Sequence, residues 1–206
     1  MSGLSLDAIV ARFRDVPTSI ISDNLDRLRG ANGIRPFHKG GKLAGVATTI
    51  KTRAGDNLII HEALAQAPLG NVLVIDGESD VSRALVGEIM VEIAIHRELA
   101  GIVIDGAIRD VGAIALKNFP CYARGFTHRG PYKNGPGYIN VPVSIGGMIV
   151  NPGDILIGDE DGVVAFSPNE AEFLLAAAKA QQDREDEILA SIRADTYSGS
   201  YAAGKE

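Results

Sequence analysis

The stretch Gly101-Ile102-Val103-Ile104-Asp105-Gly106-Ala107-Ile108-Arg109-Asp110 lies near the middle of the chain and decides its fold. Residues 102–104 are continuously apolar and β-branched, as in a strand that is covered on both faces. Asp105-Gly106 is a typical turn pair, so we expect the strand to end there. Ligands of open α/β sheets bind at the carboxyl ends of the strands. The sequence therefore predicts a site at Asp105, Arg109 and Asp110.

Arg109 and Asp110 are neighbours in the chain, which restricts how both could reach one ligand. On a strand, adjacent side chains point to opposite faces of the sheet. The two side chains can therefore converge only in a loop or in the first turn of a helix, and Gly106 would make such a turn easy. Capping of a helix over 111–117 is the competing interpretation of Asp110.

A second strand followed by an Asp-Gly pair precedes the first in the chain. Residues 71–75 are apolar apart from Asn71 and lead into Asp76-Gly77, and a helix is expected over 84–100. This order reads as a strand, a crossover helix and a parallel strand. Both Asp-Gly pairs would then open on the same edge of one sheet.

Gly87 and Glu88 are expected near the start of that helix. Free backbone N–H groups and the helix dipole favour an anion there, and a glycine lets a ligand approach the backbone closely. A carboxylate cradle and a purely structural role, in packing and dipole complementation, are equally compatible with the sequence. Glu88, Glu92 and His96 also recur every four residues, and a solvated helix face with one ion pair is more typical of this spacing than a metal site.

The remaining elements follow from hydrophobic periodicity and turn residues. Ser167-Pro168-Asn169-Glu170 is a capping box with proline at the first helical position. We expect helices over 4–13 and 19–29 with Gly30 as the C-cap, a strand over 43–51 with a possible bulge at Gly45, a helix over 57–66, a strand over 119–123, a long loop over 125–137, short antiparallel strands over 139–166, a helix over 168–193 and a frayed tail over 197–206.

Composition is that of an ordinary single globular domain spanning residues 1–206, with N-terminal helices over 4–30 and a core over 40–166. The chain is 46% hydrophobic and 22% charged, with a net charge of −6. Its basic residues are scattered, which disfavours nucleic acid as a partner. No stretch approaches the ~20 apolar residues of a membrane span, so a cytoplasmic protein is expected. The single cysteine, Cys121, excludes an internal disulfide and is expected to be buried.

Several catalytic motifs are absent from the sequence. It contains no G-x-G-x-x-G, P-loop, H-E-x-x-H or G-x-S-x-G pattern, so nucleotide cofactors and a serine nucleophile have no support. His61-Glu62 lacks the second histidine of a zinc motif. His128 lies in the long loop, where a solvated histidine is more typical than a phosphate carrier.

Taken together, the motifs resemble the RraA-like family, which includes metal-dependent 4-hydroxy-4-methyl-2-oxoglutarate aldolases and regulators of ribonuclease activity. The D-G-x-x-R-D element at this spacing from G-E carries most of the resemblance. The matching pieces are Gly87-Glu88-Ile89-Met90, Asp105-Gly106-Ala107-Ile108-Arg109-Asp110, Asn140-Val141-Pro142-Val143, Gly146-Gly147, Pro152-Gly153-Asp154 and Asp159-Glu160-Asp161-Gly162-Val163-Val164. They fall in the expected order over residues 15 to 190.

The resemblance implies a β/β/α sandwich-barrel of the swivelling-domain type, assembled as a homotrimer or a hexamer with sites between subunits. It also implies a set of site residues. Asp110 would hold a divalent cation, magnesium or manganese, largely through water, and Arg109 would bind the oxygens of a pyruvate-like 2-oxo acid. Backbone N–H groups from Gly87 through Glu88 and Ile89 to Met90 would take its carboxylate. Glu88 and Asp105 would orient metal-bound water, and Glu185 of a neighbouring subunit is a candidate further carboxylate.

The implied activity is a carbon–carbon lyase reaction. An aldolase of this kind cleaves a 4-hydroxy-2-oxo acid to pyruvate through an enolate, and oxaloacetate decarboxylation would follow at the same site. A cation and a guanidinium can stabilise the negative charge that develops. A non-catalytic regulator that binds a ribonuclease or another protein is the main alternative, and a phosphohistidine carrier using His128 is a second. No nucleotide-binding loop supports a methyltransferase.

Overall fold

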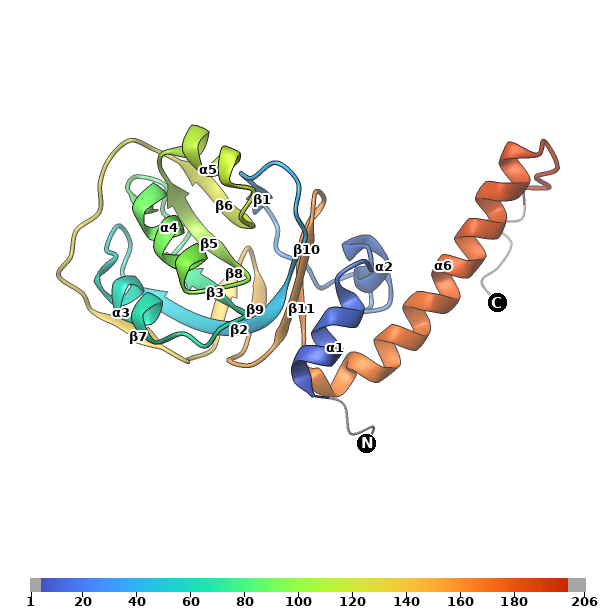
Figure 1. Ribbon diagram of the computed structural model, residues 1–206, viewed down its shortest axis with the longest axis horizontal. Coiled ribbons are helices and arrows are strands. Elements are labelled where there is room, and N and C mark those ends of the chain that lie inside the picture. Colours follow the sequence, from blue (N-terminus) through green and yellow to red (C-terminus); the bar gives the residue numbers. More distant parts are fainter. Residues whose placement is uncertain (1–4, 200–206) are drawn as a thin grey trace.

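The computed structural model describes residues 5–199 and is built around a curved sheet that nearly closes into a barrel, flanked by helices (Figure 1). The sheet has the strand order β1-β6-β5-β3-β2-β10-β11, with β4 beside β5 and β7 beside β2, and β8 and β9 form a separate hairpin. The strands are β1 (Arg35–Pro36), β2 (Leu43–Thr52), β3 (Asn71–Asp76), β4 (Ala84–Val86), β5 (Gly101–Ile108), β6 (Cys121–Phe126), β7 (Gly137–Ile139), β8 (Val143–Ile145), β9 (Met148–Val150), β10 (Ile155–Asp159) and β11 (Gly162–Phe166). The helices are α1 (Leu6–Phe13), α2 (Thr18–Asp23), α3 (Leu58–Gln66), α4 (Glu88–His96), α5 (Val111–Lys117), the 3-10 turn η1 (Pro168–Glu170) and α6 (Ala171–Arg193).

The centre of the sheet is parallel, as the sequence predicts. β2 pairs with β3, β3 with β5 and β5 with β6 in parallel, and α4 lies on the connection between β3 and β5. Asp76 is the register partner of Asp105, so the two Asp-Gly pairs do lie side by side. The late strand β10 and the short strand β7 add antiparallel partners to β2, which confirms the antiparallel texture predicted after residue 139.

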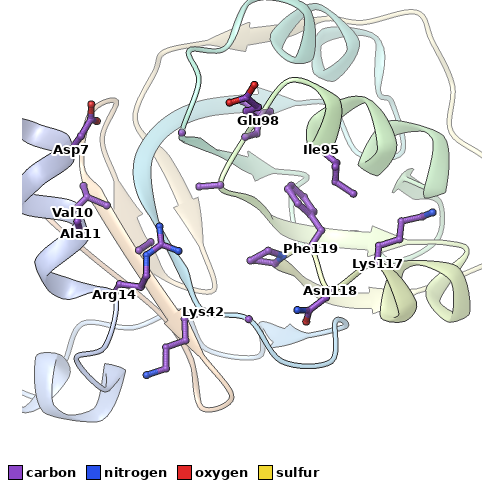
Figure 2. Close-up of a pocket in the computed structure, with 16 residues that line it drawn as sticks. Asp7, Val10, Ala11, Arg14, Lys42, Ile95, Glu98, Lys117, Asn118 and Phe119 are labelled. Atoms are coloured by element: carbon purple, nitrogen blue, oxygen red, sulfur yellow. The ribbon is translucent and has the colours of Figure 1, made fainter.

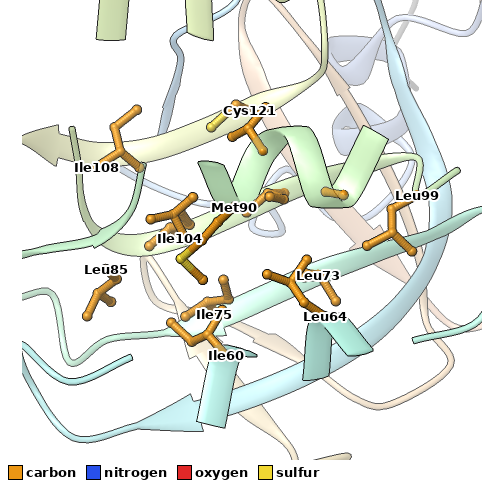
Figure 3. Close-up of a cluster of buried hydrophobic side chains, with 14 of the residues drawn as sticks. Ile60, Leu64, Leu73, Ile75, Leu85, Met90, Leu99, Ile104, Ile108 and Cys121 are labelled. Atoms are coloured by element: carbon orange, nitrogen blue, oxygen red, sulfur yellow. The ribbon is translucent and has the colours of Figure 1, made fainter. Parts of the chain in front are cut away.

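Helices α3, α4 and α5 cover one face of the parallel strands (Figure 1). Figure 3 shows the cluster of buried side chains between these layers. Its members include Ile60 and Leu64 of α3, Leu73 and Ile75 of β3, Leu85 of β4, Met90 of α4, Ile104 and Ile108 of β5, and Cys121 of β6. Full burial of such side chains stabilises the fold by about 1.5–3 kcal/mol each.

The opposite face of β5 points into the barrel, where the hairpin β8–β9 closes it. Val103 packs there, while Ile102 and Ile104 on either side of it face the helices. The prediction that residues 102–104 are covered on both faces is therefore confirmed. The inner cluster also contains Val72, Val74, Val143, Ile145, Met148 and Val150.

Helices α1, α2 and α6 pack against β10 and β11 on the far side of the sheet. Phe13 of α1 and Phe166 of β11 meet there with ring centroids 4.7 Å apart. The predicted capping box at Ser167 is present, with Glu170 accepting from the Ser167 N–H. Beyond Ala178 no residue of α6 is buried, and the helix runs away from the body of the protein (Figure 1).

The predicted turn at Asp105-Gly106 is wrong, because β5 continues without interruption to Ile108. β4 lies alongside the end of β5, with Ala84 opposite Ala107, and this parallel pairing prolongs the strand. A side chain at position 106 would come within 3.0 Å of the Leu85 side chain, so the glycine permits close strand packing.

Three other predictions need correction. The helix expected over 84–100 begins only at Glu88, since residues 84–86 form β4. The helix expected over 19–29 ends at Asp23, because the backbone turns left-handed at Asp26 (φ 61°), and Gly30 caps nothing. Gly45 pairs regularly with Leu156 and makes no bulge. Leu4 and residues 200–206 of the predicted tail lie outside the described residues.

Within residues 5–199, none of the helices combines the length and the apolar composition that crossing a bilayer requires.

Candidate active site

Arg109 and Asp110 lie in the two-residue link between β5 and α5, and their side chains converge. Arg109 Nε is 3.6 Å from Asp110 Oδ2, and both side chains are rather more than two-fifths exposed. Asp110 adopts a left-handed backbone conformation (φ 58°, ψ 34°), which aspartate tolerates better than most residues. That conformation breaks the alternation of side chains along the strand and brings the Asp110 side chain to the same side as Arg109.

The Asp110 carboxylate caps a helix, although not the helix that follows it in the chain. It makes no side-chain bond to the start of α5, and its Oδ2 instead accepts the Glu88 N–H of α4 at 3.0 Å. Gly87 makes this approach possible, because a Cβ there would lie 2.6 Å from Asp110 Oδ2 and 2.9 Å from Arg109 Nε. The G-E and R-D motifs are therefore in direct contact.

The backbone cradle predicted from Gly87 to Met90 is partly occupied by the protein itself. The Glu88 N–H donates to Asp110, and the Met90 N–H donates to the Gly87 carbonyl at 3.1 Å. The Ile89 side chain is 73% exposed, whereas the Met90 side chain belongs to the buried core. A bound carboxylate would thus compete with Asp110 for the first N–H of α4.

The Glu88 side chain is held by a lysine of α5. Lys117 Nζ lies 3.0 Å from Glu88 Oε1 and also contacts the Glu92 carboxylate. The hydrogen bonds that Lys117 donates to the Glu92 and Glu88 carboxylates raise the pKa of Lys117. The predicted solvated face with an ion pair is therefore present on α4, and within residues 5–199 no cluster of three His, Cys, Asp or Glu side chains could hold a metal ion.

Asp105 does not reach the Arg109–Asp110 pair. Its side chain is on the barrel side of β5, where its Oδ1 accepts from Arg124 Nε at 2.5 Å and its Oδ2 from the Gly146 N–H at 2.7 Å. Burial alone would raise the pKa of Asp105, but the Arg124 and Gly146 hydrogen bonds and the Arg124 charge lower it. The reason for the separation is that β5 does not turn at this residue. Asp105 thus ties two elements to β5: β6 through Arg124, which sequence reasoning missed, and the hairpin β8–β9 through the Gly146 N–H.

A cavity of about 580 Å³ opens between these elements at the carboxyl ends of β5 and β6. Its lining contains the predicted residues Glu88, Arg109 and Asp110, the start of α5 (Val111, Gly112, Ala113), and Phe126, Thr127 and His128. Sequence reasoning missed Phe126 and Thr127, for which their position at the start of the loop predicted over 125–137 was the available signal. His128 is exposed on this cavity wall.

A second cavity, of about 630 Å³, lies at the opposite edge of the sheet, beside α1 (Figure 2). Gly70, Ala100 and Pro120, which stand at the amino ends of the parallel strands, line it together with Arg14, Lys42 and Glu98. Loops at the carboxyl ends of strands are the usual places for ligands in such sheets. The cavity at the carboxyl ends, of about 580 Å³, is the smaller of the two, and it is the one that contains the residues predicted from the sequence.

Comparisons with known proteins find a matching family model, a related sequence and similar structures. The family model RraA-like, described as Aldolase/RraA, matches residues 18–165. A Halalkalibacterium halodurans protein that carries the provisional name 4-hydroxy-4-methyl-2-oxoglutarate aldolase is 40% identical over 183 residues, 88% of this chain and 87% of that protein. An uncharacterized protein from Pseudomonas syringae pv. tomato has a similar structure, with a TM-score of 0.81 at 25% identity over 91% of this chain and 93% of its own. The RNA-processing inhibitor RraA of Thermus thermophilus gives a TM-score of 0.68 at 27% identity, over 74% of this chain and 93% of its own.

Proposed function

Because the chain belongs to the RraA-like family, we propose that it is a divalent-metal-dependent aldolase that cleaves a 4-hydroxy-2-oxo acid, of the 4-hydroxy-4-methyl-2-oxoglutarate type, to pyruvate. Oxaloacetate decarboxylation at the same site is part of the proposal. The observation that supports it most is the convergence of one guanidinium and one carboxylate on an open cavity. Both reactions leave the enolate of pyruvate, whose negative charge a fixed cationic donor stabilises.

Asp110 is the residue that would hold the cation. Its Oδ1 has no hydrogen-bond partner within residues 5–199, and its side chain is 42% exposed. Magnesium commonly binds through one or two carboxylates and keeps several waters, so a single accessible carboxylate fits it, and manganese has similar oxygen preferences. When bound, the ion would supply a second positive charge beside the substrate oxygens.

Arg109 would bind and orient the 2-oxo acid. Its planar guanidinium can donate two parallel hydrogen bonds to a carboxylate, which fixes the orientation of the anion as well as its position. The adjacent N-terminus of α4 adds a positive dipole end to the same cavity. Both features favour a small anionic substrate.

Glu88 and Asp105 receive roles that differ from those implied by the family resemblance. Glu88 would act through its N–H, which positions Asp110, since its carboxylate is bound by Lys117. Asp105 would hold Arg124 and the hairpin β8–β9. Lys117 is a poor candidate for a Schiff base, because the glutamates that raise its pKa keep it protonated.

The test is pyruvate release from oxaloacetate and from 4-hydroxy-4-methyl-2-oxoglutarate by the purified protein with magnesium. We expect a chelator to abolish release and added magnesium or manganese to restore it. Because magnesium alone slowly decarboxylates oxaloacetate, the reaction without protein is the required blank. Asp161→Ala, which changes an exposed carboxylate far along the chain from the site, is a control for Asp110→Ala.

A regulatory role is the second candidate, because the RNA-processing inhibitor of Thermus thermophilus shares this fold. The absence of chelator-sensitive pyruvate release from both substrates would favour binding to a ribonuclease or another protein over catalysis. A phosphohistidine carrier would require phosphate transfer that His128→Ala abolishes.

We also propose that the protein assembles as a homotrimer or a hexamer with its sites between subunits. The exposed outer part of α6 supports an assembly contact, since Leu189 and Ile192 are 45% and 50% exposed. Glu185 lies on the same part of α6 and accepts a hydrogen bond from Gln181. It remains the candidate carboxylate for a neighbouring subunit's site.

A further inference from the structure

Arg83, just before β4, fastens the loop 127–136 to the body of the protein. Its Nη1 donates to the Gly130 carbonyl at 2.8 Å and its Nη2 donates to the Tyr132 hydroxyl at 2.8 Å. The guanidinium carbon also lies 4.1 Å from the centre of the Tyr132 ring. Arg83 forms no ion pair within residues 5–199, so its hydrogen-bonding capacity is directed to neutral groups of this loop.

The rest of the loop is fixed at both of its ends. At the start, the Thr127 N–H donates to the Ile108 carbonyl at 2.9 Å. At the far end, the buried Asp56 carboxylate accepts the N–H groups of Asn134 and Gly135 at 2.7 and 3.0 Å. The middle of the loop is held by backbone hydrogen bonds at Arg129 and Tyr132 and by the Arg83 side chain. Arg83 is therefore the side chain that holds the segment nearest the candidate site.

Gly130 connects this fastening to Arg109. A Cβ built on Gly130 would lie 3.4 Å from Arg109 Nη1, so Gly130 is a neighbour of the guanidinium and even a methyl group at this position would press against it. The Nε of the same guanidinium lies 3.6 Å from Asp110 Oδ2 and close to Gly87. Arg109 is thus confined between the loop and the start of α4, and Arg83 sets the position of the loop.

We propose that Arg83 is a positioning residue, which fastens the loop 127–136 so that Gly130 confines the Arg109 guanidinium in the orientation that a 2-oxo acid requires. This inference rests on the proposed function. Small displacements of a binding group cost large factors in catalysis, so loss of this fastening should be measurable. The effect should fall on substrate binding, because Arg83 touches neither Asp110 nor the start of α4.

The first experiment is a kinetic comparison of Arg83→Met and Arg83→Lys with the wild type. For Arg83→Met we expect KM for oxaloacetate to rise about tenfold, with the magnesium concentration for half-maximal activity unchanged. Lysine retains a hydrogen-bond donor and a positive charge that can lie over the Tyr132 ring. The KM of Arg83→Lys should therefore be closer to the wild-type value than that of Arg83→Met. Arg27→Met, which removes an exposed arginine paired with Asp23 on α2, is the matched control and should leave KM unchanged.

The second experiment measures amide hydrogen exchange of the loop and needs no turnover. Exchange over 127–136 should become faster in Arg83→Met and stay slow in Arg27→Met, while α3 and α4 keep their protection. An unchanged KM in an active Arg83→Met enzyme would overturn the positioning role and leave the proposed function intact. If the wild type proved inactive, the proposed function would fail, and unchanged loop exchange in Arg83→Met would then overturn the fastening as well.

Discussion

At the scale of single residues, the backbone of Asp110 decides whether a site exists. Continued extension would place Arg109 and Asp110 on opposite faces of the sheet. The left-handed conformation at Asp110 brings them within 3.6 Å of one another. Gly87 completes the arrangement, because any side chain there would occupy the space between them.

Replacement of Arg109 or Asp110 should separate their two roles. Arg109→Ala should lower kcat/KM for oxaloacetate at least a hundredfold, about 3 kcal/mol of barrier, and weaken pyruvate binding. Asp110→Ala should remove activity together with its response to magnesium. Steady-state kinetics with a magnesium titration measures both, with Arg12→Ala on α1 as the control for a lost surface arginine. Wild-type rates in either variant would contradict the assignment.

Gly87→Ala tests the contact between the two motifs. The backbone of Gly87 is extended (φ −137°), so alanine is conformationally allowed, but its Cβ would collide with the Asp110 carboxylate. We expect activity to fall about tenfold or more with little change in melting temperature, since the displaced groups are at the surface. Gly112→Ala, with nothing within 4 Å of the added Cβ on the same cavity, should retain activity.

Asp56 links stability to pH. Burial alone would raise its pKa, but three backbone N–H groups and the Arg53 charge outweigh this and lower the pKa from its ordinary 3.8. The carboxylate therefore stabilises the fold above the unfolded-state pKa, and this contribution is lost as the pH falls through the lower folded-state pKa. Asp56→Asn should cost about 3 kcal/mol in urea unfolding at pH 7, and the difference from the wild type should shrink below about pH 4. A difference that stayed constant with pH would refute this account.

At the scale of elements, the parallel strands pack closely because glycines occupy positions where a larger residue would collide with a neighbouring element. Gly101 opens β5, which lies between β3 and β6, and a Cβ there would lie 2.9 Å from the Pro120 carbonyl and closer still to the Leu43 side chain. Gly45 of β2 is similarly enclosed, by the Gly70 carbonyl and Ala100. These glycines are packing residues, since neither has a positive φ.

Gly101→Ala should therefore be destabilising by about 1–3 kcal/mol, the usual cost of overpacking a rigid site. Gly112→Ala, in the open first turn of α5, should be neutral or stabilising by up to about 1 kcal/mol. Chemical denaturation of the two variants measures the contrast, and equal stabilities would show that β5 can move away from its neighbours at little cost.

At the scale of the whole molecule, α6 extends beyond the body and leaves apolar side chains exposed (Figure 1). Light scattering after gel filtration should give three or six times the chain mass of 21.7 kDa. The double substitution Leu189→Asp and Ile192→Asp should reduce this mass if α6 carries the contact. Ala180→Asp, on an exposed position nearer the body, is the comparison variant. A monomeric wild type would contradict the proposed assembly.

The sequence determined the parallel strands, the capping box and the convergence of Arg109 with Asp110, because apolar runs and local turn chemistry are encoded in neighbouring residues. Its predicted turn at Asp105 was wrong, and its second helix was too long. At Asp105 partners distant in the chain decide the outcome, because β4 prolongs β5 and Arg124 with Gly146 binds the Asp105 carboxylate. The second helix ends at Asp23, and the backbone is left-handed at Asp26. Only the tertiary structure could bring Gly87 against Asp110 and Gly130 against Arg109, because such contacts depend on how separate elements pack and not on any local pattern.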